Sequence, residues 1–188
     1  MRRSWFALLL AVALLALPTA AAAGSIEQSE IFHAEGQKLL AAGEYKLALD
    51  KFTQAYTTYP LAKSVFGIAS AYEGLGNLPR ALDAYETFTQ YEQTDEVLGR
   101  VEAETRKLKA KLSLEYGEIF IFSSPGEAQI IIDEISKQNV YQTPTRRWLK
   151  AGDHVIFFKK DGTVPREIKL SVQKGEHLYI YTGLKATR

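Results

Sequence analysis

Cysteine is absent from the 188 residues of the chain. This absence excludes disulfide bonds, cysteine-ligated zinc, iron–sulfur clusters and a thiol nucleophile. A surplus of one charge is absent too, because 23 lysines and arginines are balanced by 22 aspartates and glutamates, for a net charge of +1. Without a basic surplus to neutralise phosphates, we expect no binding to nucleic acid. A hydrophobic content of 46% instead predicts a folded, globular protein.

Catalytic motifs are also missing. The sequence contains no G-x-S-x-G elbow, no H-E-x-x-H zinc motif, no phosphate-binding loop and no dinucleotide fingerprint. We therefore expect no enzymatic activity, no catalytic residue and no cofactor. His154, Asp153 and His177 could form a metal site if their strands were neighbours, but the sequence does not place a complete ligand set. We favour a hydrogen bond from each strand-start histidine to a turn, and we expect no metal.

The N-terminus has the three parts of a bacterial secretory signal peptide. Two arginines, at positions 2 and 3, precede 13 apolar residues from Trp5 to Leu17, and a run of small residues then ends at Ala23. This pattern predicts a signal peptide at 1–23, cleavage between Ala23 and Gly24, and export to the periplasm or cell surface. The alternative is an inner-membrane anchor formed by residues 5–23, which are just long enough to span a bilayer.

The spacing of apolar residues changes once along the remaining chain, which predicts two domains. From 24 to 114 apolar residues recur every three or four positions, whereas from 118 to 188 they alternate between turn residues. We place the junction at 115–117, where Gly117 is expected to end the last helix. The predicted fold class is α+β in separate domains, with a helical N-terminal domain and a small antiparallel β-sandwich after it.

The helical segment contains an internal repeat with an offset of 33 residues. Each unit reads as a helix, a glycine turn and a second helix. The matched pairs are Gly36 and Ala69, Leu39 and Tyr72, Gly43 and Gly76, Ala48 and Ala81, and Phe52 and Tyr85. Small residues let the paired helices approach closely, and the aromatic residue four positions after each second-helix alanine fills the space beside it.

This spacing of small and aromatic residues resembles the tetratricopeptide repeat over about residues 29–93. A further helix, at about 94–114, resembles the cap helix that ends such arrays. Phe88 departs from the pattern, because the first unit has Ala55 at the equivalent position. The resemblance implies a concave groove that binds an extended peptide or a partner helix. Two repeats are few for such an array, so self-association is an alternative way to cover its surface.

The first helix of each unit has a face that the repeat does not use for packing. On each of these faces, four residues at positions i, i+3, i+7 and i+10 form one stripe. The stripes are Glu30, His33, Gln37 and Leu40 in the first unit, and Lys63, Phe66, Ser70 and Glu73 in the second. We predict that they line a partner-binding groove. The alternative is a solvated face on which Phe66 packs against the cap helix.

Six short strands are predicted in the C-terminal segment, at 118–123, 128–133, 146–150, 154–160, 166–173 and 177–184. Ile168, Leu170 and Val172 alternate with polar residues, so we expect one face of their strand to lie in solvent. Asp133 is interpreted as a turn residue.

The order of turns and apolar residues in this segment resembles the PEGA domain over about 118–185. The matching residues include Pro125, Ala128, Ile130, Ile132, Asp133, Thr143, Pro144, Ala151, Gly152, Asp161 and Gly162. That family is a small β-sandwich of extracytoplasmic bacterial proteins, often joined to other modules. The resemblance implies an anchor or spacer without catalysis.

The combined pattern predicts a non-enzymatic envelope protein. Its helical groove is expected to bind a peptide or protein partner, and its β-sandwich is expected to anchor it at the cell wall or surface. One alternative is a structural component that forms homo-oligomers. A weaker alternative is a glycan-binding or glycan-processing protein, because Trp148, Tyr179 and Tyr181 could stack on sugars, although strand aromatics are more often part of a core.

Overall fold

The computed structural model describes residues 20–133 and 140–187, with side chains from Ser25 onward within these ranges. Most of the expected signal peptide, residues 1–19, lies outside the described residues. Helix α1 (Ala20–Ala41) begins before the expected cleavage site between Ala23 and Gly24. In the described part of the chain, no helix is long and apolar enough to cross a membrane.

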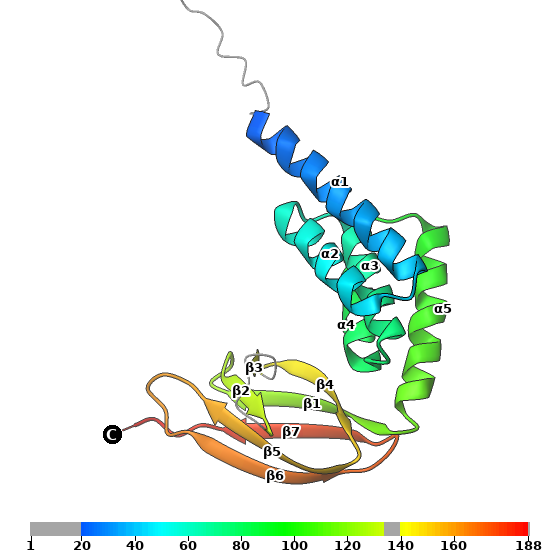
Figure 1. Cartoon of the computed structure of the whole chain (residues 1–188). Coiled ribbons are helices and arrows are strands. Elements are labelled where there is room, and N and C mark those ends of the chain that lie inside the picture. Colours follow the sequence, from blue (N-terminus) through cyan, green and yellow to red (C-terminus); the bar gives the residue numbers. More distant parts are fainter. Residues whose placement is uncertain (1–19, 134–139, 188) are drawn as a thin grey trace, which may run out of the picture.

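Helices come first and strands second, and the two kinds of element occupy separate parts of the molecule (Figure 1). The remaining helices are α2 (Tyr45–Thr58), α3 (Ala62–Gly74), α4 (Leu78–Phe88) and α5 (Asp95–Leu112). Helix α1 packs against α2, α3 against α4, and α2 against α3, so two helical hairpins lie side by side. The expectation of an α+β chain with segregated elements is confirmed.

A glycine in the left-handed conformation ends the first helix of each hairpin. Gly43 has a φ of 77° and Gly76 a φ of 72°. At both turns, the amide after the glycine donates to the carbonyl five positions earlier, which closes the helix end. These pairs are Glu44 with Leu39 and Asn77 with Tyr72, each at 2.9 Å. The two turns therefore have the same geometry at the predicted offset.

The ring of Phe52 lies between two glycines on neighbouring helices. A Cβ atom at Gly36 of α1 would come within 2.8 Å of this ring, and one at Gly67 of α3 within 2.5 Å. Ala48 and Ala81 are fully buried where the paired helices meet. The structure confirms that small residues permit the close approach and that the aromatic ring fills the remaining space.

Helix α5 packs against α4 at the end of the helical stack. The helix expected at about 94–114 is present, and it buries Val101, Leu108 and Leu112. The prediction that Gly117 ends this helix was wrong, because α5 ends at Leu112 and Gly117 lies in strand β1. A Cβ atom at Gly117 would come within 2.5 Å of Val172 Cγ1, so close packing inside the β half explains this glycine.

Two sheets make up the β half. The strands are β1 (Tyr116–Ser124), β2 (Gln129–Ile132), β3 (Val140–Gln142), β4 (Thr145–Lys150), β5 (Gly152–Lys159), β6 (Arg166–Val172) and β7 (His177–Gly183). One sheet has the order β4-β1-β7 and the other has the order β3-β2-β5-β6. Strand β3 was not predicted. The prediction of a purely antiparallel sandwich was also wrong, because β7 reaches β1 by a crossover from β6 and pairs with it in parallel.

The inward faces of both sheets form one apolar core. Its largest members are Ile119, Ile121, Ile130, Ile132, Ile156 and Phe158. Ile168 and Leu170 pack against this core, and Val172 belongs to it, while the residues between them are exposed. The alternation predicted for β6 is therefore confirmed.

The helical half meets the three-stranded sheet through ion pairs between α4 and β4. Arg147 Nη1 lies 2.8 Å from Asp83 Oδ2, and Arg146 pairs with Glu86, which also lies 3.1 Å from Lys109 Nζ. Burial raises the pKa of Asp83, although the charges of both arginines act to lower it. Burial lowers the pKa of Arg146, but the hydrogen bond and charge of Glu86 outweigh this, so its pKa is raised. These contacts hold β4 against α4.

Candidate functional site

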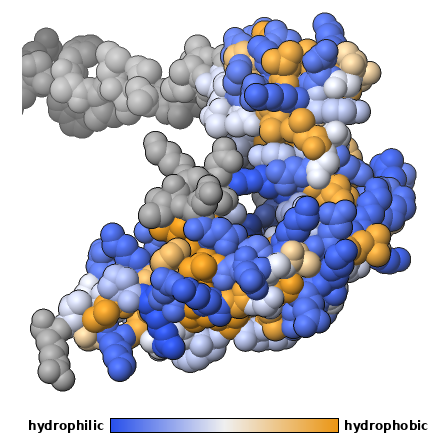
Figure 2. Space-filling view, turned by 60° about the horizontal axis from the view of Figure 1, so that its bottom comes forward, coloured by the Kyte–Doolittle hydropathy of each residue, from blue (hydrophilic) through white to orange (hydrophobic). Residues whose placement is uncertain are grey.

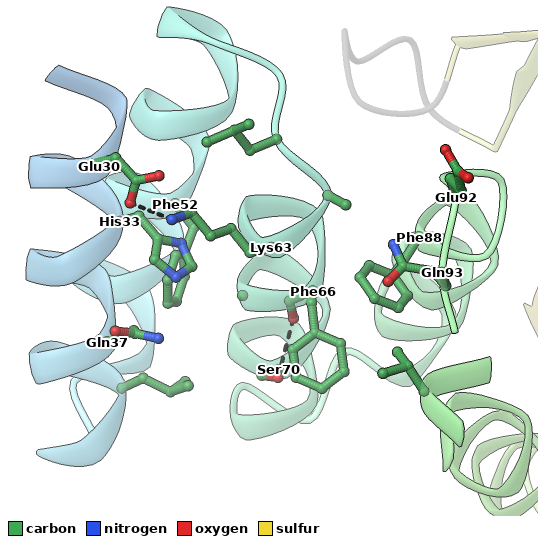
Figure 3. Close-up of a pocket in the computed structure, with 15 residues that line it drawn as sticks. Glu30, His33, Gln37, Phe52, Lys63, Phe66, Ser70, Phe88, Glu92 and Gln93 are labelled. Carbon is green, nitrogen blue, oxygen red and sulfur yellow. Dashed lines mark hydrogen bonds and ion pairs between the residues drawn. The ribbon is translucent and has the colours of Figure 1, made fainter. Parts of the chain in front are cut away.

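A groove of about 680 Å³ opens between α1, α3 and the segment that joins α4 to α5 (Figure 3). All but one of the predicted stripe residues line it. They are Glu30, His33, Gln37, Leu40, Lys63, Phe66 and Ser70. The structure therefore brings the two stripes together in one hollow.

One ion pair spans the groove between equivalent positions of the two units. Lys63 Nζ on α3 pairs with Glu30 Oε2 on α1. Both side chains are nearly half exposed, so the pair contributes little to stability. Its main effect is to place two hydrogen-bonding groups at one end of the groove, where Figure 3 shows them beside His33.

His33 is the most buried polar side chain of the groove. It is only 7% exposed, and its ring centroid lies 5.3 Å from that of Phe52. Burial, and then the charge of Lys63, lower the pKa of His33, while Glu30 acts to raise it. His33 is therefore neutral at pH 7. Sequence analysis placed this residue on an open helix face, but the structure buries it in the wall of the groove.

The environment of His33 also selects its tautomer. Its Nδ1 is buried and has no hydrogen-bond partner among the described residues. Buried N–H groups without a partner are rarer than buried acceptors without one, so we expect the proton on Nε2. The imidazole projects from α1 into the space between α1 and α3 (Figure 3).

Phe66 forms the apolar part of the groove. Its ring is 41% exposed and meets the rings of Tyr85 and Phe88 edge-on, at centroid distances of 5.5 and 5.4 Å. Phe66 also lines a second hollow of about 530 Å³ beside Val97 and Val101. One part of the Phe66 side chain therefore lines the groove, and another part lies near the cap helix α5, as the two alternatives for this residue proposed.

Sequence analysis missed the third wall of the groove. This wall consists of Phe88, Glu92, Gln93 and Val97. The signal that could have found it was the departure at Phe88 from the small residue of the first unit. With a large ring at this position, the end of α4 contacts Phe66 and extends the groove toward α5.

Glu73 does not line the groove, although the stripe included it. Its Oε2 accepts a hydrogen bond from the Tyr85 hydroxyl at 3.3 Å. Burial raises the pKa of Tyr85; the hydrogen bond with Ser70 opposes this, and the charge of Glu73 adds to it. Glu73 therefore contacts the Tyr85 ring behind Phe66 and does not form part of the groove wall.

The conceivable metal site is not assembled. His154 Nδ1 lies 2.8 Å from Asp133 Oδ2, and His154 Nε2 lies 2.6 Å from the Lys150 carbonyl oxygen. His177 lies on the other sheet and pairs with Glu118. In residues 20–133 and 140–187, no group of three His, Cys, Asp or Glu side chains could hold a metal ion. The prediction of a hydrogen bond to a turn is confirmed for His154, which bonds to Asp133, and is wrong for His177, whose partner Glu118 lies in strand β1.

The aromatic residues of β7 lie on the surface. Tyr179 and Tyr181 are 72% and 71% exposed, so the expectation that they belong to a core was wrong. The reason is the phase of the strand, because Leu178 and Ile180 take the inward positions. Trp148 on β4 is half-buried, and its Nε1 has no partner among the described residues.

Comparison with known proteins adds no family assignment: no protein-family model matches the chain, and no curated protein matches it significantly. Its function must therefore be inferred from the groove and its surroundings.

Proposed function

We propose that the protein is a non-enzymatic component of the bacterial cell envelope that binds a segment of another protein in its helical groove. The β half serves as an anchor or spacer at the cell wall or surface. Export is proposed from the signal-like pattern at 1–23. The resemblances to the tetratricopeptide repeat and to the PEGA domain support the two roles.

The observation that carries this proposal is the assembly of both stripes into one groove. Phe66, which is 41% exposed, offers an apolar surface for a partner side chain, and the buried ring of Phe88 supports it from behind. Glu30, Lys63 and Gln37 offer hydrogen bonds along the same hollow. Its volume of about 680 Å³ lies in the usual range of binding pockets. Aromatic anchors of this kind contribute much of the energy when a peptide or helix docks in a groove.

The groove offers little for catalysis. The hydroxyl of Ser70 donates to the Phe66 carbonyl of its own helix at 3.1 Å. His33 packs on Phe52 instead, and in the described part of the chain it forms no hydrogen bond with the Ser70 hydroxyl that could activate it. A nucleophile needs a base within hydrogen-bond reach, so these residues support binding rather than group transfer.

Site-specific photo-crosslinking tests the proposal. A photoreactive residue at Gln37, inside the groove, should capture one defined partner segment in the envelope fraction. The matched control is Lys38, which is the next residue of α1, is exposed and does not line the groove. Phe66→Ala, which truncates the exposed ring of the groove, should reduce capture at Gln37. Equal capture at both positions, or capture unaffected by Phe66→Ala, would contradict a binding groove.

A further inference from the structure

Strand β7 has an open edge. It is the last strand of the sheet β4-β1-β7, and it pairs only with β1 among the described residues. Figure 1 shows it on the side of β1 away from the helices. The Glu118 amide donates to the Glu176 carbonyl, and the Leu184 amide donates to the Ser124 carbonyl, each at 2.8 Å.

These two bonds fix which backbone groups of β7 remain unused. In a parallel ladder, alternate residues direct both backbone groups to the same neighbour. Since positions 176 and 184 bond to β1, so do 178, 180 and 182. The amides and carbonyls of His177, Tyr179, Tyr181 and Gly183 therefore point to the open edge, where the Gly183 carbonyl accepts a bond from Arg166 at 3.2 Å.

The other sheet edges carry features that hinder pairing. Strand β3 has only three residues, and β6 presents charged Glu167 and Lys169 outward. Strand β4 lies against α4 through its arginines. In contrast, β7 has no Lys, Arg, Asp, Glu or Pro from His177 to Gly183, and it exposes two tyrosines.

We propose that β7 pairs antiparallel with β7 of a second copy of the chain, about a two-fold axis at Ile180. In this register, Tyr179 faces the partner's Tyr181 and exchanges both backbone hydrogen bonds with it. His177 faces the partner's Gly183, whose carbonyl oxygen already accepts from Arg166, so this outer pair contributes less than the central pair. The backbone groups of Tyr179 and Tyr181 all point outward, so the centre of the edge is complementary to itself.

Side chains and charges fit the same register. Each Tyr179 would pair with a tyrosine across the strands and extend its stack on Phe120, whose ring lies 4.7 Å away at an angle of 8°. Aromatic pairs opposite each other stabilise antiparallel strands. On the inner face Ile180 meets its own copy. The pairing ends at Gly183, because the Lys185 carbonyl beyond it accepts from the Val164 amide of the same chain at 2.8 Å. From His177 to Gly183 no like charges lie opposite each other.

The expected association is weak. A tyrosine covers about 150–250 Å² when fully buried, so four rings that are seven-tenths exposed contribute at most roughly 700 Å². Specific interfaces usually bury at least about 1,200 Å² in total. We therefore expect a monomer–dimer equilibrium that depends on concentration, with the helical groove left open in both copies.

Cysteine crosslinking tests the register, because the chain has no cysteine of its own. Cα atoms that face each other across such a pair are close enough for a disulfide. Ile180→Cys should therefore form a disulfide-linked dimer under mild oxidation. Phe122→Cys, exposed on the neighbouring strand β1, is the matched control and should remain uncrosslinked. A thermal melt of each reduced variant shows whether the fold is kept.

Sedimentation of the purified protein over a range of concentrations tests the edge itself. Tyr181→Pro removes an amide that points outward and leaves the ladder to β1 intact, and it should raise the dimer dissociation constant about tenfold or more. Tyr181→Thr, which keeps the amide, should have a smaller effect. If the protein stays monomeric and Ile180→Cys does not crosslink, the edge serves a peptide strand or a glycan instead, and the proposal is wrong. A dimer that Tyr181→Pro leaves unchanged would also overturn it.

Discussion

The ion pair between Asp83 and Arg147 joins the two halves, and its two partners should not be equally important. Burial raises the pKa of Asp83, so the cost of burying its charge exceeds the attraction of the arginines. Arg147 has a second contact, because its guanidinium lies 4.5 Å from the Tyr141 ring centroid. Removing the carboxylate therefore leaves Arg147 with a partner, whereas removing the guanidinium leaves Asp83 with only the more distant charge of Arg146.

This asymmetry gives different magnitudes for two single substitutions. Breaking a fully buried pair by removing one partner costs about 3–5 kcal/mol. The side chains here are 35% and 23% exposed, so we expect about 2 kcal/mol for Arg147→Met. For Asp83→Asn, we expect less than about 1 kcal/mol, since the amide keeps a hydrogen bond and loses the buried charge.

Urea unfolding followed by fluorescence is a suitable assay, because Trp148 is adjacent to Arg147 and half-buried. The pH dependence provides an internal check. A carboxyl whose pKa is raised on folding destabilises the protein when ionised, and this effect declines as pH falls through the folded pKa. The cost of Arg147→Met should therefore shrink as the pH is lowered, and the double variant should resemble Asp83→Asn. Equal costs for the two single substitutions at neutral pH would refute this reasoning.

Three further predictions concern the helical half. Because burial lowers the pKa of His33, stability should be unaffected by its titration above about pH 6.5 and should decline as pH falls below it, and His33→Phe should flatten this decline in pH-dependent melts. Gly67→Ala should cost roughly 1–3 kcal/mol in urea unfolding, since the added Cβ would come within 2.5 Å of the Phe52 ring, whereas Gly99→Ala, where a Cβ meets nothing within 4 Å, should cost nothing. Phe66→Ala should cost about 1–2 kcal/mol of stability, because its ring is 41% exposed, but it should reduce partner capture more than Ala81→Leu, which destabilises the fold by overpacking. If the two variants are equally stable and reduce partner capture by the same amount, this prediction is contradicted.

The helical repeat could be predicted because its determinants are local and occur twice. Gly43 and Gly76 each need a left-handed conformation, and Ala48 and Ala81 each lie at a close helix contact. Such requirements leave the same residue types at the same offset, whatever the rest of the chain does. The order of helices and strands could be predicted too, because the spacing of apolar residues along the sequence is also a local feature.

The β half was harder to predict, since pairing between distant strands is not encoded locally. A strand of three residues such as β3 is too short to show an alternation. The parallel pairing of β1 with β7 depends on the path of the intervening strands through the other sheet. The phase of β7 could have been read from Leu178 and Ile180, which are apolar and aliphatic, but the tyrosines between them are also hydrophobic enough to belong to a core.

The groove could be predicted from the sequence only in part. Its two stripes follow helical periodicity and were found, but its third wall comes from the link between α4 and α5, which has no counterpart in the first unit. Phe88 was visible as an irregularity of the repeat, and the structure shows its consequence, because its ring contacts Phe66. Phe88 is itself 5% exposed and belongs to the core of the second hairpin, so its ring fills space that the alanine of the first unit leaves to other side chains. It shapes the groove indirectly, because it supports the exposed ring of Phe66 at the apolar end.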